Sequence, residues 1–228
     1  MRISRQILIL ILLLAPVILP AQQFFRIRAD VSVKTKLSTG EQSLTMGKIY
    51  YDRNEKKIVY DLSFPEKSML LTTDTVTYRI VDNQIIQRSF NPSMAEFSVF
   101  HLALSSHLPE FGLKRTQYEI TEVVREGEMV ITTWTPPSSL ADDLGNILIS
   151  VIDKKLFGVV FFSPDGEVIR KQFYENYVEQ DGLAFPGRII EISFSEEGEN
   201  YQIMSFKNLV LDELENNDLY TFSIDRPR

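Results

Sequence analysis

Apolar and polar residues alternate along most of the chain after residue 22, which is the pattern of half-buried β-strands. The first alternating run is the clearest, because its apolar members would all share one face: Phe25, Ile27, Ala29, Val31 and Val33. Short segments rich in Gly, Asp, Asn and Ser separate the runs, as turns do. The pattern therefore predicts a series of antiparallel strands that follow one another in sequence order.

After this first run, strands are predicted at residues 43–51, 57–64, 68–72, 75–81, 84–90, 117–124, 128–135, 146–152, 157–162, 168–178, 188–195 and 201–211, with a last short strand at 219–227. No linker-like stretch and no internal repeat interrupts the series, so residues 22–228 are expected to form a single domain. A long meander must either close into a barrel or cover its apolar face with another element.

One segment breaks the alternation and supplies a possible cover. Ser93 and Glu96 have the spacing of a capping box, which predicts a helix over residues 93–106. The large apolar residues of this segment would form one stripe along the helix: Met94, Phe97, Phe100 and Leu104. A curved sheet that holds such a helix against its concave face can enclose an apolar cavity, which is a site for a lipid-like ligand.

The first 21 residues have the layout of a secretory signal peptide. Arg2 and Arg5 form a basic start, residues 7–19 are uncharged and apolar, and Ala21 supplies a small residue for cleavage. The rival interpretation is a transmembrane anchor, but the apolar run is shorter than the roughly 20 residues that a bilayer requires. We therefore expect cleavage after Ala21 and export of residues 22–228.

The composition excludes several classes of function. The chain of 228 residues carries a net charge of -7, so it lacks the excess of positive charge with which proteins bind nucleic acid. The absence of cysteine excludes disulfides, thiolate metal sites and a lipid-modified N-terminal cysteine. Neither a G-x-S-x-G motif nor a zinc-binding His spacing is present. Glu175 and Glu191 fall in predicted strands and are interpreted as part of a solvated face, so no catalytic residue, metal or cofactor is expected.

Residues 47–66 resemble the corresponding hairpin of the LolA-like periplasmic lipoprotein carriers. The segment contains a Gly-x-hydrophobic strand from Gly47, a turn with Arg53, a second strand at residues 57–61 and a Pro65-Glu66 turn. The strands that follow, the helix after Asn91-Pro92 and the ending of the chain at residues 219–227 also fit the family pattern. Asn54 stands where the family usually has proline, and the N-terminal helix of the family is absent.

The resemblance implies a mainly β fold, an incompletely closed antiparallel β-barrel (a half-barrel) with a helical lid over an apolar cavity. It implies a periplasmic, monomeric carrier that binds acyl chains of lipoproteins and exchanges them with an inner-membrane release complex and an outer-membrane acceptor. Arg53 would contact the lid. The residues expected to line the acyl cavity are Phe25, Ile27, Ile58, Tyr60, Leu62, Tyr78, Ile80, Met94, Phe97, Phe100 and Leu104.

Other functions remain compatible with the sequence. A binding module of the same fold could sense or assemble envelope components without transport, and residues 136–145 would then be the place to look for a partner surface. A general lipid-binding protein would have the same cavity. An enzyme that uses two carboxylates would require paired Asp or Glu residues that face inward.

Overall fold

The computed structural model describes residues 24–73, 76–90 and 95–224, so the predicted signal peptide lies outside the described residues. Thirteen strands in these ranges form one sheet. The strands are β1 (Arg26–Lys36), β2 (Gln42–Asp52), β3 (Lys57–Phe64), β4 (Ser68–Thr73), β5 (Val76–Val81), β6 (Gln84–Phe90), β7 (Glu119–Glu126), β8 (Met129–Thr135), β9 (Ile147–Ile152), β10 (Lys155–Phe162), β11 (Val168–Gln180), β12 (Leu183–Ser195) and β13 (Gly198–Leu211).

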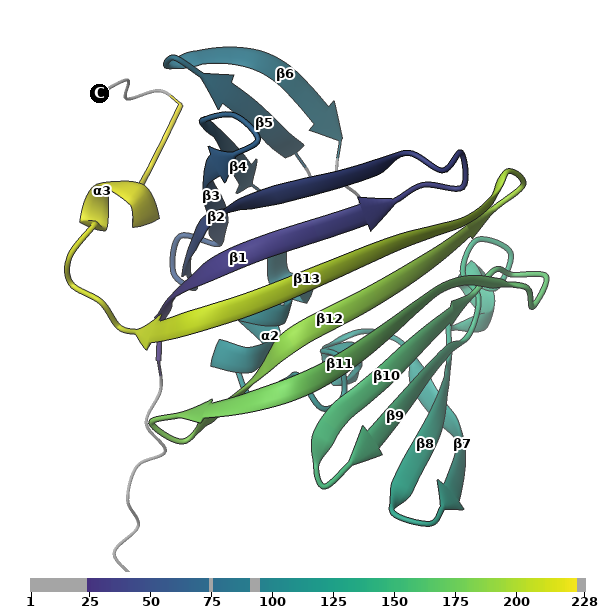
Figure 1. Cartoon of the computed structure of the whole chain (residues 1–228). Helices are drawn as coiled ribbons and strands as arrows, with labels where there is room; N and C mark the ends of the chain where they lie inside the picture. Colours follow the sequence, from purple (N-terminus) through teal and green to yellow (C-terminus); the bar gives the residue numbers. More distant parts are fainter. Residues whose placement is uncertain (1–23, 74–75, 91–94, 225–228) are drawn as a thin grey trace, which may run out of the picture.

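Every strand pairs antiparallel with its neighbours in the order β6-β5-β4-β3-β2-β1-β13-β12-β11-β10-β9-β8-β7 (Figure 1). Successive strands are adjacent within β1–β6 and within β7–β13, and the pairing of β1 with β13 joins these two halves at the centre of the sheet. β6 and β7 are the two edges, and they do not pair with each other, so the sheet does not close into a barrel. The predicted fold class, a mainly β and incompletely closed antiparallel barrel, is confirmed.

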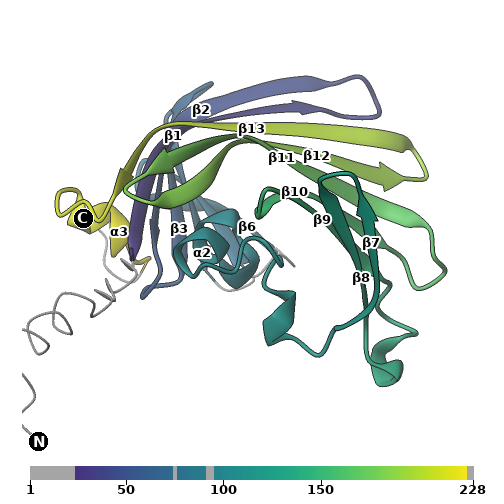
Figure 2. The ribbon, with the colours of Figure 1, turned by 90° about the horizontal axis from the view of Figure 1, so that it is seen from below.

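The connection between β6 and β7 crosses the concave side of the sheet. It contains a 3-10 turn at Ala95–Phe97 and the short helix α2 (Val99–Leu104). Figure 2, which views the molecule from below, shows α2 inside the arch that the curved sheet makes. This connection therefore covers part of the concave face, as a helical cover was expected to do.

The predicted continuous helix over residues 93–106 is wrong in its extent. Within the described part of this segment, α2 has six residues and begins after Ser98, whose side chain accepts a hydrogen bond from the backbone N–H of His101. Ser98 has extended backbone angles, as an N-cap residue does, so it separates the 3-10 turn from the helix. Ser93 of the predicted capping box lies outside the described residues.

Two other predicted boundaries differ from the structure. β12 begins at Leu183 and continues through Pro186 and Gly187, whereas the predicted strand began at residue 188. Near the C-terminus, the structure has the short helix α3 (Asn217–Tyr220) where the start of a strand was predicted. α3 packs against β2 and β3 on the convex face of the sheet instead of extending it.

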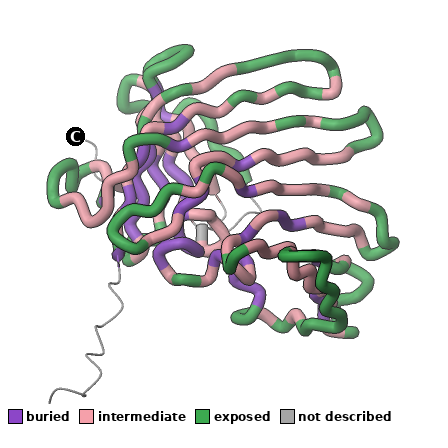
Figure 3. The backbone as a smooth tube through the Cα atoms, turned by 60° about the horizontal axis from the view of Figure 1, so that its bottom comes forward, coloured by how far each residue is buried: buried purple, intermediate pink, exposed green. Residues whose placement is uncertain are grey.

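Buried side chains form two clusters on opposite faces of the sheet. The larger cluster joins the concave faces of both halves of the sheet to α2. The smaller cluster lies on the convex face, where Tyr220 packs against Tyr50 with ring centroids 5.4 Å apart. In Figure 3, buried segments gather at one end of the long strands, and the hairpin tips at the other end are exposed. No helix in the described ranges is long and apolar enough to cross a bilayer.

Candidate ligand-binding site

A cavity of about 720 Å³ lies between the concave face of the sheet and residues 97–118, which we name the covering segment. Its wall draws on strands from both halves of the sheet, because the curvature brings them around the same space. Its larger apolar residues include Ile58, Tyr60, Phe97, Val99, Phe100, Phe111, Leu113, Ile147, Phe161, Ile189, Met204 and Phe206. The burial of Tyr60 raises the pKa of its hydroxyl to about 12, so this side chain is neutral at physiological pH.

Phe100 anchors the covering segment to the sheet. Its ring stacks on Phe185 of β12 at 5.7 Å and meets Phe206 of β13 edge-on at 5.5 Å. Phe185 and Phe206 also contact each other edge-on, at 5.5 Å between centroids. Offset and edge-to-face arrangements of this kind add to the stability that burial of the rings already gives. One end of the cavity is therefore closed by a rigid aromatic cluster.

A buried polar pair adds a directional contact to this anchor. The hydroxyl oxygen of Tyr51 on β2 lies 2.6 Å from Nδ1 of His101 in α2, and both residues are buried. Burial lowers the pKa of the His101 imidazole, the nearby Glu96 carboxylate opposes this effect, and Arg115, Lys56 and Arg53 reinforce it. A neutral imidazole that carries its proton on Nε2 can accept a hydrogen bond from the Tyr51 hydroxyl at Nδ1. We therefore assign that tautomer to His101.

Arg53 also contacts the covering segment. Its Nη1 donates a hydrogen bond to the backbone carbonyl of Leu104, at 3.0 Å, from the turn between β2 and β3. This carbonyl belongs to the last turn of α2, where backbone acceptors lack helical partners. In the same region, Lys56 forms an ion pair with Glu96 of the 3-10 turn. Thus the β2–β3 turn holds the covering segment and the 3-10 turn at its start through side chains that are separate from the aromatic anchor.

The structure distributes the predicted cavity residues over several locations. Four of them line the cavity: Ile58, Tyr60, Phe97 and Phe100. Ile27 and Leu104 are buried in the core cluster beside it. Met94 lies outside the described residues.

Three of the predicted residues need correction because they lie elsewhere. Tyr78 and Ile80 pack in the convex cluster against residues 219–224, on the opposite face from the cavity. Leu62 alternates in step with Ile58 and Tyr60 but does not line the cavity, and it borders a different hollow. Alternation shows which residues of a strand share a face, but it does not show which face becomes concave. Phe25, which precedes β1, is 44% exposed and contributes to neither cluster.

Polar residues in the cavity wall were missed by the sequence analysis. Glu191, interpreted from the sequence as part of a solvated face, lines the cavity with Gln172 and Gln202. Isoleucines on both faces of the strand around Glu191 obscured the alternation. Ile189 lies on the same face as Glu191, whereas Ile190 and Ile192 lie on the other face. A strict count of every second residue from the buried Ile189 would have identified Glu191.

The loop before β9 lines one side of the cavity. Leu144 and Gly145 line the cavity there, opposite Ser163 of the β10–β11 turn. The Tyr118 hydroxyl at the end of the covering segment donates a hydrogen bond to the carbonyl of Gly145, at 3.1 Å. The end of the segment 136–145, where a partner surface was considered, therefore lines the cavity at residues 143–145.

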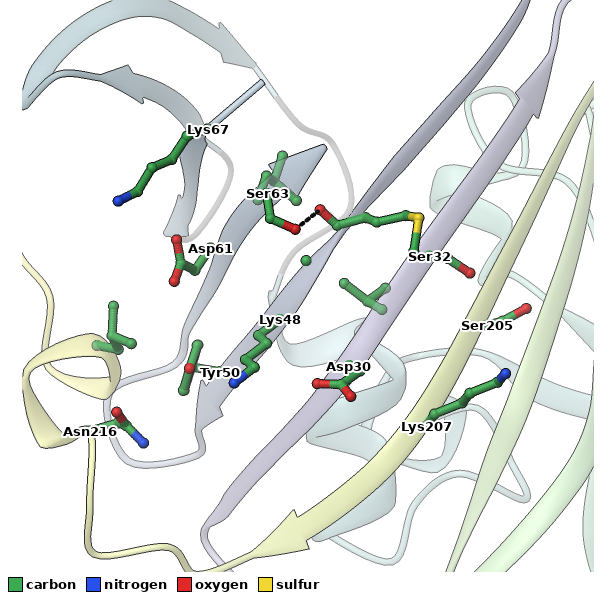
Figure 4. Close-up of a pocket in the computed structure, with 15 residues that line it drawn as sticks. Asp30, Ser32, Lys48, Tyr50, Asp61, Ser63, Lys67, Ser205, Lys207 and Asn216 are labelled. Atoms are coloured by element: carbon green, nitrogen blue, oxygen red, sulfur yellow. Dashed lines mark hydrogen bonds between the residues drawn. The ribbon is translucent and has the colours of Figure 1, made fainter. Parts of the chain in front are cut away.

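A second hollow, of about 800 Å³, lies on the convex face beside α3. Charged side chains from four adjacent strands project from the sheet there, namely Asp30, Lys48, Asp61 and Lys207 (Figure 4). This lining does not suit an apolar ligand, so the concave cavity is the better candidate for acyl chains. In the part of the chain that the structure describes, no group of three or more His, Asp or Glu residues could hold a metal ion.

Known proteins that resemble this chain are found by comparison of structures but not by comparison of sequences. No family model and no curated protein matches the chain. A LolA superfamily protein from Nitrosomonas europaea is similar in structure, with a TM-score of 0.56, 14% identity, and coverage of 88% of this chain and 91% of that one. A domain from Vibrio parahaemolyticus that is named for outer membrane lipoprotein sorting gives a TM-score of 0.59, with 12% identity and coverage of 89% and 92%.

A third similar structure is a DUF1329 family protein from Desulfovibrio piger, with a TM-score of 0.60, 11% identity and coverage of 87% of this chain and 90% of that one. Each similarity extends over nearly the whole described domain. Identities this low establish the architecture alone. The chain therefore has a LolA-like fold.

Proposed function

We propose that this protein is a non-enzymatic periplasmic carrier that binds the acyl chains of lipoproteins in the concave cavity and carries them toward the outer membrane. The observation that supports this function best is the cavity itself, because about 720 Å³ of largely apolar space lies beneath a separate covering segment. Ligand sites in proteins usually have volumes of about 300–1,000 Å³. Each buried CH₂ group contributes about 0.8 kcal/mol, so an acyl chain could bind tightly there without polar chemistry.

The LolA-like fold supports the same proposal, since one structurally similar domain is named for outer membrane lipoprotein sorting. In this proposal, the mature protein is a monomer that receives its cargo from an inner-membrane release complex and delivers it to an outer-membrane acceptor. The predicted signal peptide would direct it to the periplasm.

Release of the cargo requires a second state in which the cavity opens. Such a state must differ from the closed state by only a few kcal/mol if a partner is to shift the equilibrium. The polar contacts of Arg53 with Leu104 and of Tyr51 with His101 are the links that opening would break. We propose that these contacts, together with the Phe100 anchor, set the balance between the two states.

Two adjacent residues of β13 provide a matched test of the cavity. Met204 lines the cavity, whereas the side chain of Ile203 points to the opposite face of the same strand. Met204→Trp would fill part of the cavity and is expected to weaken binding of a fluorescent fatty acid by about tenfold or more. Ile203→Trp adds a similar volume on the other face and should bind as the unmodified protein does.

Equal binding by both variants, with each one folded by circular dichroism, would place the ligand outside this cavity. A second measurement addresses the cargo: mass spectrometry of what co-purifies with the mature protein from its own kind of cell. A one-to-one complex with an acylated lipoprotein would support the carrier function. An empty protein that also fails to take up the fluorescent fatty acid would favour an envelope-sensing or assembly module instead.

A further inference from the structure

A row of polar side chains crosses the otherwise apolar wall of the cavity. Gln172, Glu191 and Gln202 come from the adjacent strands β11, β12 and β13. Gln172 is paired with Glu191, and Glu191 is paired with Gln202, so the three side chains are neighbours on the concave face. All three line the cavity and are half-buried.

The position of this row divides the cavity into two parts. Two pairs further along the same strands, toward α2, the next concave positions are Tyr174, Ile189 and Met204. Polar groups cost free energy when they are removed from water, so packing of the core does not explain three of them in succession on this wall. The cavity is therefore amphipathic, with an apolar end against α2 and a polar band across the sheet.

The hydrogen bonds in this band run in one direction. The Tyr174 hydroxyl donates to Oε1 of Gln172 at 2.8 Å, and Nε2 of Gln172 donates to Oε2 of Glu191 at 2.6 Å. The chain of donors thus ends on a carboxylate. Within the described ranges, Oε1 of Glu191 and the side-chain amide of Gln202 make no hydrogen bond to another residue. Unused acceptors therefore face the cavity, beside an amide that can both donate and accept.

Arg170 borders the band on the side away from α2. It is paired with Ser193, two pairs beyond Gln172 and Glu191 and therefore on the same face, and its guanidinium lies 4.1 Å from the centre of the Phe161 ring. No carboxylate of the described residues lies within 4.0 Å of this guanidinium. Its donors could reach an ester carbonyl, which complements the acceptors that Glu191 and Gln202 offer to a hydroxyl.

We propose that this band binds the polar head of an amphiphile whose acyl chain occupies the apolar end, and that the head is neutral and carries hydroxyl groups. Glu191 favours hydroxyl donors and repels a free carboxylate, whereas Arg170 would attract one. Because Glu191 lies within the band and Arg170 only at its border, we take the effect of Glu191 to dominate, so a glycerol ester fits the band better than a fatty acid does. The inference rests on the proposed function, since it specifies the class of acylated ligand that the same cavity binds.

Three ligands with the same acyl chain test the proposal: monolauroylglycerol, methyl laurate and laurate, each used below its micellar concentration. The single tryptophan, Trp134, is a suitable reporter because it is buried on β8 and paired with Ile147 of the cavity wall. Tryptophan fluorescence should show monolauroylglycerol binding about tenfold more tightly than methyl laurate, the effect of one or two net hydrogen bonds.

Two variants connect the preference to the band. Gln202→Leu should reduce the preference for monolauroylglycerol over methyl laurate to about twofold or less while methyl laurate still binds. Glu191→Gln keeps an acceptor for Gln172 but removes the negative charge, so laurate should bind several-fold more tightly. Glu175→Gln is the matched control, because Glu175 lies on β11 with its side chain on the convex face.

The outcomes separate this inference from the proposed function. If none of the three ligands binds, the carrier function itself fails. If all three bind equally, or laurate binds most tightly, the cavity binds acyl chains and the head-group inference is overturned. A preference that persists in Gln202→Leu, or an equal gain for laurate in Glu175→Gln, would overturn the role of the band as well.

Discussion

At the scale of single residues, His101 illustrates what sequence can and cannot show. Its position in the sequence, beside the apolar stripe of the predicted helix, indicates a partly buried side chain. The structure adds a partner from a distant strand, the hydroxyl of Tyr51, at 2.6 Å. No local pattern could have identified this pair, because the two residues are fifty positions apart in the sequence. The functional consequence is also nonlocal, since the pair ties the covering segment to the sheet.

The stability of the protein should depend on pH through His101. Burial lowers the pKa of its imidazole in the folded state. The unfolded chain, with a histidine pKa of about 6.5, therefore binds the proton more readily. Stability should be greatest above that pH and decline as the pH falls from about 7.5 to about 5.5. Urea unfolding at the two pH values would measure this decline.

His101→Gln removes the titrating group and serves as the comparison. The variant should lose stability at both pH values, because the contact with Tyr51 is altered, but it should lose less between them than the unmodified protein does. His107→Gln is the control for the other histidine, which pairs with Glu110 away from Tyr51. An identical decline in His101→Gln and in the unmodified protein would exclude His101 as the cause.

At the scale of elements, strands were predicted well because their alternation is a direct consequence of one-sided burial. The errors concern positions where tertiary contacts override local preference. The predicted strand began only at residue 188, yet Pro186 and Gly187 both lie within β12, where an added Cβ on Gly187 would lie 2.5 Å from the carbonyl oxygen of Asn176. Glycine permits this close approach of β12 to β11. At Ser98 the structure is interrupted where the sequence predicted continuity. Ser98 caps α2 and so divides a segment whose pattern predicted one helix.

Gly47 is expected to be required for the pairing of β2 with β3. A Cβ at this position would lie 2.2 Å from the carbonyl oxygen of Asp61 and 2.7 Å from Cα of Leu62, beside a register shift. Because both contacts are with backbone atoms, Gly47→Ala should destabilise the protein by about 1–3 kcal/mol or more. Thermal unfolding followed by circular dichroism would measure the effect.

Gly158→Ala provides the control for this substitution. An added Cβ at Gly158 would lie 2.9 Å from Oγ of Ser150, a side chain that can rotate away. The loss of stability should therefore be smaller than for Gly47→Ala. Similar losses at the two positions would mean that the close contact with the backbone of β3 does not determine the cost.

At the scale of the whole molecule, the C-terminal segment fastens the first strand on the convex face. Arg26 at the start of β1 pairs with Asp52 at 2.7 Å, and its guanidinium lies 4.7 Å from the centre of the Tyr220 ring. Asp212 accepts hydrogen bonds from the backbone N–H groups of Phe25 and Arg26, at 2.8 and 3.0 Å. The sequence predicted an additional strand in this region, because short apolar segments do not distinguish a strand from a packed turn.

Tyr220→Ala should weaken this fastening without altering the cavity. Tyr220 is 1% exposed and contacts both Tyr50 and Arg26, so its truncation should cost about 3–5 kcal/mol of stability. Urea denaturation would give the loss. At temperatures where the variant remains folded, its affinity for the fluorescent fatty acid should equal that of the unmodified protein. A large loss of affinity would show that the convex cluster influences the cavity.

The general form of the cavity followed from the sequence, whereas its detailed lining did not. The alternation, the interrupting helical segment and the resemblance to a known family together led to a half-barrel with a covered apolar face. Which side of β5 faces inward depends on the register between β4 and β5, where Leu71 is paired with Tyr78. Such a register is a property of the assembled sheet. The polar band was missed for the same reason, since it exists only when β11, β12 and β13 are aligned.

The pairing of β1 with β13 has a consequence for the order of folding. β1 finds one of its two partners only in β13, the last strand of the described residues. A chain that is synthesised or threaded through a membrane from its N-terminus therefore presents β1 long before β13 is available. Contacts between such distant segments form slowly, because the loop between them must close first. The sheet would remain incomplete until β13 emerges. An incomplete sheet would keep the polypeptide unfolded during the export that we propose.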